Sequence, residues 1–216
     1  VHHREPGYEF RPARNYRDVA HEPFANLTER IIEDLGGQVV RVGHPGMTPF
    51  PSRSGFIDLS TEAEDAFNLQ AYAISRARFM VGVSTGPLQL ASALGTPVAS
   101  TNAVIPSETP GCWNQHDLCL HRNIFLTDGS RVPSAEAARH ELFDRRRLVG
   151  LEQANQLRVL ENSTDELFQV AQILHDRTVD VTGWRVPIQE PFPDRDIPNQ
   201  FSMPVRQTKS VPVVEF

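Results

Sequence analysis

The chain has 216 residues, a net charge of −6 and an apolar fraction of 39%. This length can bury one hydrophobic core, and the composition lies outside the range of disordered chains. The acidic balance argues against a nucleic-acid-binding surface, although a local basic pocket for a phosphate stays open. No apolar run approaches the roughly 20 residues that a membrane-spanning helix needs, so we expect no membrane span.

The cysteine content indicates a reducing compartment. Cys112 and Cys119 are the two cysteines, and their spacing matches no common zinc-binding pattern. A disulfide between them stays open, but two reduced thiols in a cytoplasmic protein are the simpler interpretation. No signal peptide is visible. Because the chain begins at Val1 rather than at a methionine, we expect it to be part of a longer protein.

The first half of the chain alternates strand and helix patterns. Residues 1–5 resemble the end of a strand, and residues 23–35 have the apolar spacing of a helix that Gly36 and Gly37 end. Residues 38–42 then form a short apolar run typical of a buried strand, and residues 43–55 are rich in turn formers.

The pattern continues through the second half. Thr61 and Glu64 fit a capping box for a helix that extends to Ile74. A buried strand is predicted at residues 79–83, a short helix at 87–94 and a strand from 97. Ser134 could cap a helix that ends at His140. Ser163 and Glu166 fit a second capping box, before an amphipathic helix.

Alternating strands and helices predict an α/β fold, a Rossmann-like parallel sheet with helices on both faces. We expect this domain to span residues 1–178. Residues 179–216 hold six of the 17 prolines and are expected to form an extended tail that lies on a surface or reaches a neighbour. Ligands of such sheets bind at the carboxyl ends of the strands, which directs attention to Arg4, Gly43, Ser84 and Asn102.

The strongest functional signal is the run Ser84, Thr85, Gly86 and Pro87, which joins a predicted strand to a predicted helix. The first turn of a helix offers unpaired N–H groups and the positive end of the helix dipole to an anion. Gly86 would let a ligand approach the backbone, and the two hydroxyl groups can donate to phosphate oxygens. The alternative is a plain N-cap, in which Ser84 or Thr85 holds the helix start.

The second signal is Arg4, which with His3 ends the first predicted strand. An arginine there could hold a diphosphate leaving group through two parallel hydrogen bonds and stabilise the charge that builds up on it. The alternative is an arginine paired with Glu5 or Glu9.

Five further residues are weaker candidates for substrate binding, and three of them have a structural alternative. They are Arg14, Arg41, Asp58, Asp65 and Asn102. For Arg41 the alternative is an outward-facing salt bridge, and for Asp58 it is a role in starting the next turn. Asp65 could face a base or solvent, and Asn102 could line a sugar pocket. His44 follows a strand but is more simply explained as an exposed loop residue, so no general base is named.

These segments together resemble a group of bacterial glycosyltransferases. The resemblance covers roughly residues 2–177. It rests on His3, Arg4, Glu5, Gly7 and Tyr8; Arg14, Asn15 and Tyr16; Gly36 and Gly37; Val40, Arg41, Val42 and Gly43; Arg78, Phe79 and Gly82; Ser84, Thr85 and Gly86; Asn102; and Glu161, Asn162, Ser163 and Thr164. More distantly, the chain looks like the fucosyltransferases that use GDP-fucose, and residues 84–97 are similar to the donor-site motif of heptosyltransferases. Gly86 stands where the fucosyltransferases have phenylalanine, which leaves the sugar open.

The resemblance implies the C-terminal, donor-binding lobe of the two-lobed GT-B fold. It implies a transferase that moves a sugar from a GDP-, UDP- or ADP-linked donor to an acceptor glycan, lipid or protein, with an N-terminal lobe outside this chain. No metal or further cofactor is expected. Asp194 and Asp196 fit a metal-binding Asp-x-Asp pattern, but such short patterns are frequent by chance.

Two rival functions stay open. The domain could be an inactive lobe that binds a glycan or a protein, with the proline-rich tail as its docking element. It could also be a nucleotide-sugar epimerase of related fold.

Overall fold

The computed structural model describes residues 1–5, 16–61, 66–104 and 114–178. Several residues that the sequence singles out lie outside these ranges and are not placed: Arg14, Glu64, Asp65, Cys112, Asp194, Asp196 and the tail at 179–216.

Five of the described strands run parallel in two groups. One group pairs β1 (Val39–Arg41) with β2 (Phe56–Asp58). The other has the order β3 (Met80–Val83), β4 (Val98–Ala103) and β5 (Leu118–His121). A sheet of two or three strands is small for a domain of this size. The architecture therefore depends on whether the two groups belong to one sheet.

The N-terminal segment, residues 1–3, makes that connection. The Val1 nitrogen donates to the Val40 carbonyl at 2.7 Å, and the Val42 amide donates to the Val1 carbonyl at 3.1 Å. On its other edge, the His2 amide donates to the Val81 carbonyl at 3.0 Å and its carbonyl accepts from Val83 at 3.3 Å. These are the slanted bonds of a parallel ladder, so one sheet runs from β2 to β5.

The resulting strand order is β2, β1, the N-terminal segment, β3, β4 and β5. Numbered along the chain, this is the 3-2-1-4-5-6 order of the Rossmann fold, as expected. The order reverses between the N-terminal segment and β3. In open α/β sheets, the crevice at this reversal is where ligands bind.

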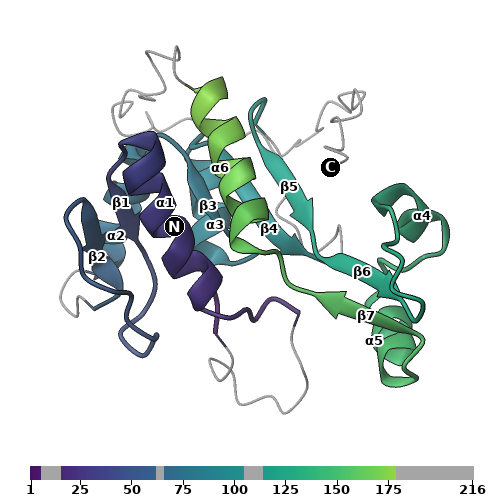
Figure 1. Ribbon diagram of the computed structural model, residues 1–216. Helices are drawn as coiled ribbons and strands as arrows, with labels where there is room; N and C mark the ends of the chain where they lie inside the picture. Colours follow the sequence, from purple (N-terminus) through teal and green to yellow (C-terminus); the bar gives the residue numbers. More distant parts are fainter. Residues whose placement is uncertain (6–15, 62–65, 105–113, 179–216) are drawn as a thin grey trace, which may run out of the picture.

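Helices cover both faces of the sheet. Helices α1 (Glu22–Leu35) and α6 (Thr164–Arg177) lie side by side across one face (Figure 1). Helices α2 (Ala66–Arg76) and α3 (Gly86–Ala93) pack on the other. Successive side chains of a strand point to opposite faces of the sheet. Val81 packs with α1 and α6 on one face, whereas Met80 packs with α2 and α3 on the other.

An antiparallel ribbon extends from the sheet and carries its own small core. It consists of β6 (Asn123–Leu126) and β7 (Leu157–Leu160), with α4 (Ser134–Arg139) and α5 (Arg145–Gln153) beside it (Figure 1). Leu148 and Val159 are buried in this second cluster, which Tyr16 also joins.

The sequence patterns located several element ends correctly. Gly36 ends α1 with a left-handed φ of 64°, and its N–H donates to the Ile31 carbonyl. Ser163 and Glu166 form the predicted capping box of α6. The cap of α4 was wrong: Pro133 is its N-cap, and Ser134 lies inside the helix. Strand β2, the short 3-10 helix at Leu59–Thr61, helix α5 and the ribbon were not predicted.

Gly82 provides a test of the central strand pairing. A Cβ atom on Gly82 would lie 2.6 Å from the His2 carbonyl oxygen, which is too close for any real contact. We expect Gly82→Ala to lower the free energy of unfolding by about 1–3 kcal/mol, because the N-terminal segment must shift. Urea denaturation measures the change.

Gly150→Ala is the matched control, because a Cβ atom added to this residue of α5 would meet nothing within 4 Å. This substitution should raise stability by about 0.5–1 kcal/mol. Equal stability of the Gly82→Ala protein and its parent would contradict the central position of residues 1–3.

Candidate functional site

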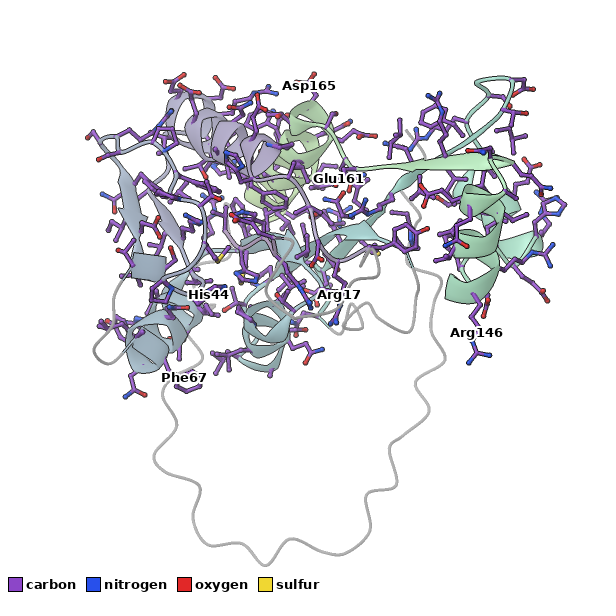
Figure 2. All side chains as sticks on the ribbon, turned by 90° about the horizontal axis from the view of Figure 1, so that it is seen from below. Arg17, His44, Phe67, Arg146, Glu161 and Asp165 are labelled. Carbon is purple, nitrogen blue, oxygen red and sulfur yellow. The ribbon has the colours of Figure 1, made fainter. Side chains whose placement is uncertain are left out.

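The candidate site lies at the carboxyl ends of the strands, around the reversal of strand order. Arg4 directly follows the N-terminal segment, and Ser84 directly follows β3. Parallel strands end on one edge of the sheet, so the sheet brings these two positions to neighbouring strand ends, as the sequence predicted. Figure 2 looks onto this edge of the molecule.

Helix α3 begins at this edge without a side-chain cap. Thr85 is its N-cap residue, but the Thr85 hydroxyl donates backwards to the Val83 carbonyl at 3.0 Å and caps no helical N–H. A Cβ on Gly86 would meet nothing within 4 Å, so the space in front of the first turn is open in the described part of the chain. An uncapped helix start facing open space is suited to an anion.

Arg4 is held rigidly at the strand end next to the one that leads into α3. Its side chain is buried and its Nε lies 2.8 Å from Asp18 Oδ1. The Arg4 carbonyl also accepts from the Val19 amide at 2.8 Å. Asp18 is a partner that sequence reasoning did not single out; of the two partners considered there, Glu9 lies outside the described residues.

A second arginine fixes the segment that carries Asp18. Arg122 directly follows β5, and its Nη2 donates to the carbonyls of Tyr16 at 2.6 Å and Asp18 at 2.7 Å. Arg122 is buried and also lies 3.7 Å from Glu161. The one sequence signal for it is its place at the end of a strand.

Residues His3, Glu5, Arg41, Thr48 and Asp58 gather at the ends of the neighbouring strands, and we call them the carboxyl-end cluster. Arg41 is fully buried, with Nη1 3.0 Å from Asp58 Oδ2 and Nη2 3.8 Å from Glu5 Oε1. Its guanidinium lies 4.1 Å from the centre of the Phe50 ring. The salt bridge considered for Arg41 therefore exists, but it faces inward rather than outward.

His3 and Glu5 complete the carboxyl-end cluster. The His3 ring is fully buried between Phe24 and Phe50, and its Nε2 donates to Glu5 Oε1 at 2.9 Å. Burial lowers the pKa of His3 to about 4, so the ring is neutral. Partial burial opposes ionisation of Glu5, but hydrogen bonds from Thr48 and His3 outweigh it and hold its pKa below the usual range.

The charges in the carboxyl-end cluster show which side suits a phosphate. Two carboxylates, Glu5 and Asp58, face the single guanidinium of Arg41, and the Asp58 carboxylate also accepts from the Ser60 amide and hydroxyl. The net charge of the carboxyl-end cluster is therefore −1, which repels an anion. The carboxyl-end cluster is therefore less suited to an anion than the α3 side of the crevice, and His3, Arg41 and Asp58 hold the strand ends in place.

Asn102 has a structural role beyond the one expected. It is buried in β4 with a left-handed φ of 55°, where the pairing with β5 shifts register. Its amide donates to Asn162 Oδ1 at 2.7 Å, and its own Oδ1 accepts from the Asn162 amide at 2.8 Å. This reciprocal pair fastens the strand end to the start of α6.

His44 lies at the same edge of the sheet. In Figure 2, Arg17 lies towards the middle of the view, with His44 on one side and Arg146 at the far end of the other. Nδ1 of His44 pairs with the Gly46 amide at 3.1 Å, so in the neutral ring Nε2 carries the hydrogen. This tautomer makes the outer nitrogen a donor rather than a base.

Comparison with known proteins gives no match: no protein-family model, curated protein or solved structure matches the chain. Within the described ranges, no group of three or more histidine, cysteine, aspartate or glutamate side chains is placed to hold a metal ion. No helix in that part of the chain combines the length and apolar character needed to cross a membrane.

The buried histidines predict a pH dependence of stability. Burial lowers the pKa of both His2 and His3 to about 4, whereas an unfolded chain binds these protons near pH 6.5. These two rings should therefore leave the free energy of unfolding unaffected by pH above about 6.5 and lower it as the pH falls from about 6.5 to 4. Each ring contributes up to about 1.4 kcal/mol per pH unit. Urea denaturation at pH 7.5, 6 and 5 measures the slope.

His2→Asn should reduce that slope, because it removes one of the two titrating rings. Asparagine can retain a donor near the position of Nδ1, which contacts the Val42 carbonyl at 2.9 Å. The control is His140→Gln, since the His140 side chain is 64% exposed. A free energy of unfolding that is the same at pH 7.5 and pH 5 would contradict the burial of both rings.

A second pair of variants tests Asn102. Asn102→Gly keeps the left-handed backbone but removes the Oδ1 acceptor, which leaves the Asn162 amide without that partner. Asn155→Gly changes an exposed asparagine with nearly the same φ, 54°. We expect Asn102→Gly to cost about 1–3 kcal/mol more than Asn155→Gly in urea denaturation. Equal effects would show that the Asn102–Asn162 pair adds nothing to stability.

Proposed function

We propose that this domain binds the diphosphate of a nucleotide sugar and forms the donor-binding lobe of a metal-independent glycosyltransferase. One observation carries the proposal: the reversal of strand order places an uncapped helix start and a buried arginine on adjacent strand ends. The resemblance to GT-B enzymes supplies the reaction class. An N-terminal lobe outside this chain would bring the acceptor glycan, lipid or protein.

In this proposal the diphosphate lies in front of Gly86, where the first-turn N–H groups of α3 and the hydroxyl of Ser84 face it. Arg4, oriented by Asp18, is the cation closest to the bond that breaks. As the bond from the anomeric carbon to the diphosphate oxygen breaks, negative charge accumulates on the leaving group. Preorganised dipoles and a fixed guanidinium stabilise that charge more in the transition state than in the ground state.

The remaining bond changes involve the acceptor. Its hydroxyl oxygen forms the new bond to the anomeric carbon, and its proton passes to a base. We assign that base to the other lobe, because the neutral His3 is fully buried and the described tautomer of His44 presents a donor.

One observation favours the alternative of an inactive lobe that binds a glycan or a protein. Arg4 is paired with Asp18 at 2.8 Å, and an arginine neutralised in this way can serve stability alone. An inactive lobe would keep the α3 start and the Rossmann-like fold, yet would need no cation at the leaving group.

Thermal denaturation with GDP, UDP and ADP tests the donor site. A nucleotide present at ten times its Kd adds about 1.4 kcal/mol of stability, which raises the Tm of a domain this size by about 3–5 °C. Gly86→Ala should not lower the Tm of the free protein, because its Cβ meets nothing within 4 Å. It should also reduce the nucleotide-induced shift, measured from the variant's own Tm without nucleotide, because the Cβ occupies the space assigned to the phosphate.

The proposal fails if none of the three nucleotides raises the Tm at millimolar concentration. A full shift in the Gly86→Ala protein would instead move the phosphate away from α3.

Arg4 separates the transferase from the inactive lobe. We expect Arg4→Lys and Arg4→Ala to weaken nucleoside diphosphate binding at least tenfold by calorimetry, since a bidentate charged contact is lost. Asp18→Asn is the matched control for the ion pair. If Arg4→Ala only lowers the Tm and leaves the Kd for the nucleotide unchanged, the arginine is structural and the inactive-lobe function is favoured.

A further inference from the structure

A groove of about 600 Å³ opens at the amino-terminal ends of the strands, on the side of the sheet opposite the candidate site. Its walls come from α2, from β1 and Ile57 of β2, from the end of α1 with the loop that follows it, and from the segment that leads into β3; we call it the α2 groove. Its principal side chains are Val40, Ile57, Leu69, Tyr72 and Ala73, with His175 of α6 at the rim.

The α2 groove exposes more apolar surface than single surface residues normally do. Ile57 is 50% exposed, Leu69 45% and Tyr72 60%, and all three line the same hollow. Scattered apolar residues need no explanation, but a continuous apolar hollow indicates a surface that another segment covers.

The chain leaves the described fold at the rim of the α2 groove. Helix α6 ends at Arg177, and Arg78 clamps this end: its Nη2 donates to the His175 carbonyl at 2.6 Å and its Nε to the Thr178 hydroxyl at 2.9 Å. Arg78 and His175 both line the groove. The described part of the chain therefore ends, at Thr178, next to a residue that lines the apolar hollow.

We propose that residues 179–188 of the same chain lie in the α2 groove, with Trp184 as the main apolar contact. From β3 to β2 the sheet has three steps between neighbouring strands. At about 4.8 Å a step this is roughly 15 Å, which an extended chain covers in about five residues. The six residues from Val179 to Trp184 span that distance.

The composition of the segment fits an apolar hollow. Val181, Trp184, Val186 and Ile188 offer apolar side chains at intervals of two or three residues, and Pro187 restricts the unfolded chain. A second copy of the chain could cover the same surface. The own-chain segment is favoured because it starts at the groove, which gives it a high effective concentration there.

Tryptophan fluorescence tests this contact. The chain has two tryptophans, so Trp113→Phe leaves Trp184 as the reporter. If Trp184 lies in the α2 groove, its emission is shifted to shorter wavelength and acrylamide quenches it poorly. Leu69→Lys or Tyr72→Lys should return both properties to those of a free tryptophan. Should Trp113→Phe not fold, the difference spectrum between the parent and Trp184→Phe gives the same reading.

Leu126→Lys is the matched control, since Leu126 is 40% exposed on β6 and does not line the groove. It should leave the Trp184 signal unchanged, and the groove variants should keep their response to nucleoside diphosphates. Solvent-like emission in the parent overturns the proposal. So does a blue shift that survives Leu69→Lys and Tyr72→Lys, or one that appears only as protein concentration rises, which would indicate a second copy.

Discussion

The insertion of residues 1–3 between β1 and β3 is the constraint on which the rest of the structure depends. Without these hydrogen bonds, the parallel strands would form a two-stranded and a three-stranded piece. The close fit requires a residue without a side chain at Gly82, next to the His2 carbonyl. It also buries two histidines as neutral rings, one bonded to a backbone carbonyl and one held between phenylalanines.

The electrostatics of the candidate site follow from this central strand. Glu5 joins Arg41 and Asp58 on one side of the crevice, and Arg4 pairs with Asp18 while β3 leads into the uncapped start of α3. Charged groups that are buried this deeply need partners to offset their lost hydration. The partners found here also orient the groups, so one strand separates the acidic side of the crevice from the side proposed to bind an anion.

The parts of the fold that local pattern determines were predictable from the sequence. Helix α1 has regular apolar spacing and a glycine stop, α6 has a capping box, and β3 is a short apolar run before a proline-initiated helix. Strand β2 was missed because its three residues, Phe56–Asp58, are too few to show a period. Strand β6 pairs with β7 antiparallel, a departure that alternation of elements does not suggest.

The candidate site was predictable in position but not in its pairings. The rule that ligands bind at the carboxyl ends of strands located Arg4 and Ser84 from the sequence. The partners of Arg4 and Asn102 are Asp18 and Asn162, which are 14 and 60 residues away along the chain. No local pattern encodes such distances. A charged residue in a strand normally faces water, so the burial of Arg41 over Phe50 depends on the tertiary structure alone.

Tyr16 connects the ribbon to the candidate site through its side chain and its backbone carbonyl. Its ring packs in the core beneath β6 and β7, and its hydroxyl donates to Glu152 of α5 at 2.7 Å. Its carbonyl accepts from the same Arg122 nitrogen that holds the Asp18 carbonyl. Tyr16 and Arg122 therefore connect α5 and the core of the ribbon, through consecutive hydrogen bonds, to the segment whose Asp18 carboxylate orients Arg4.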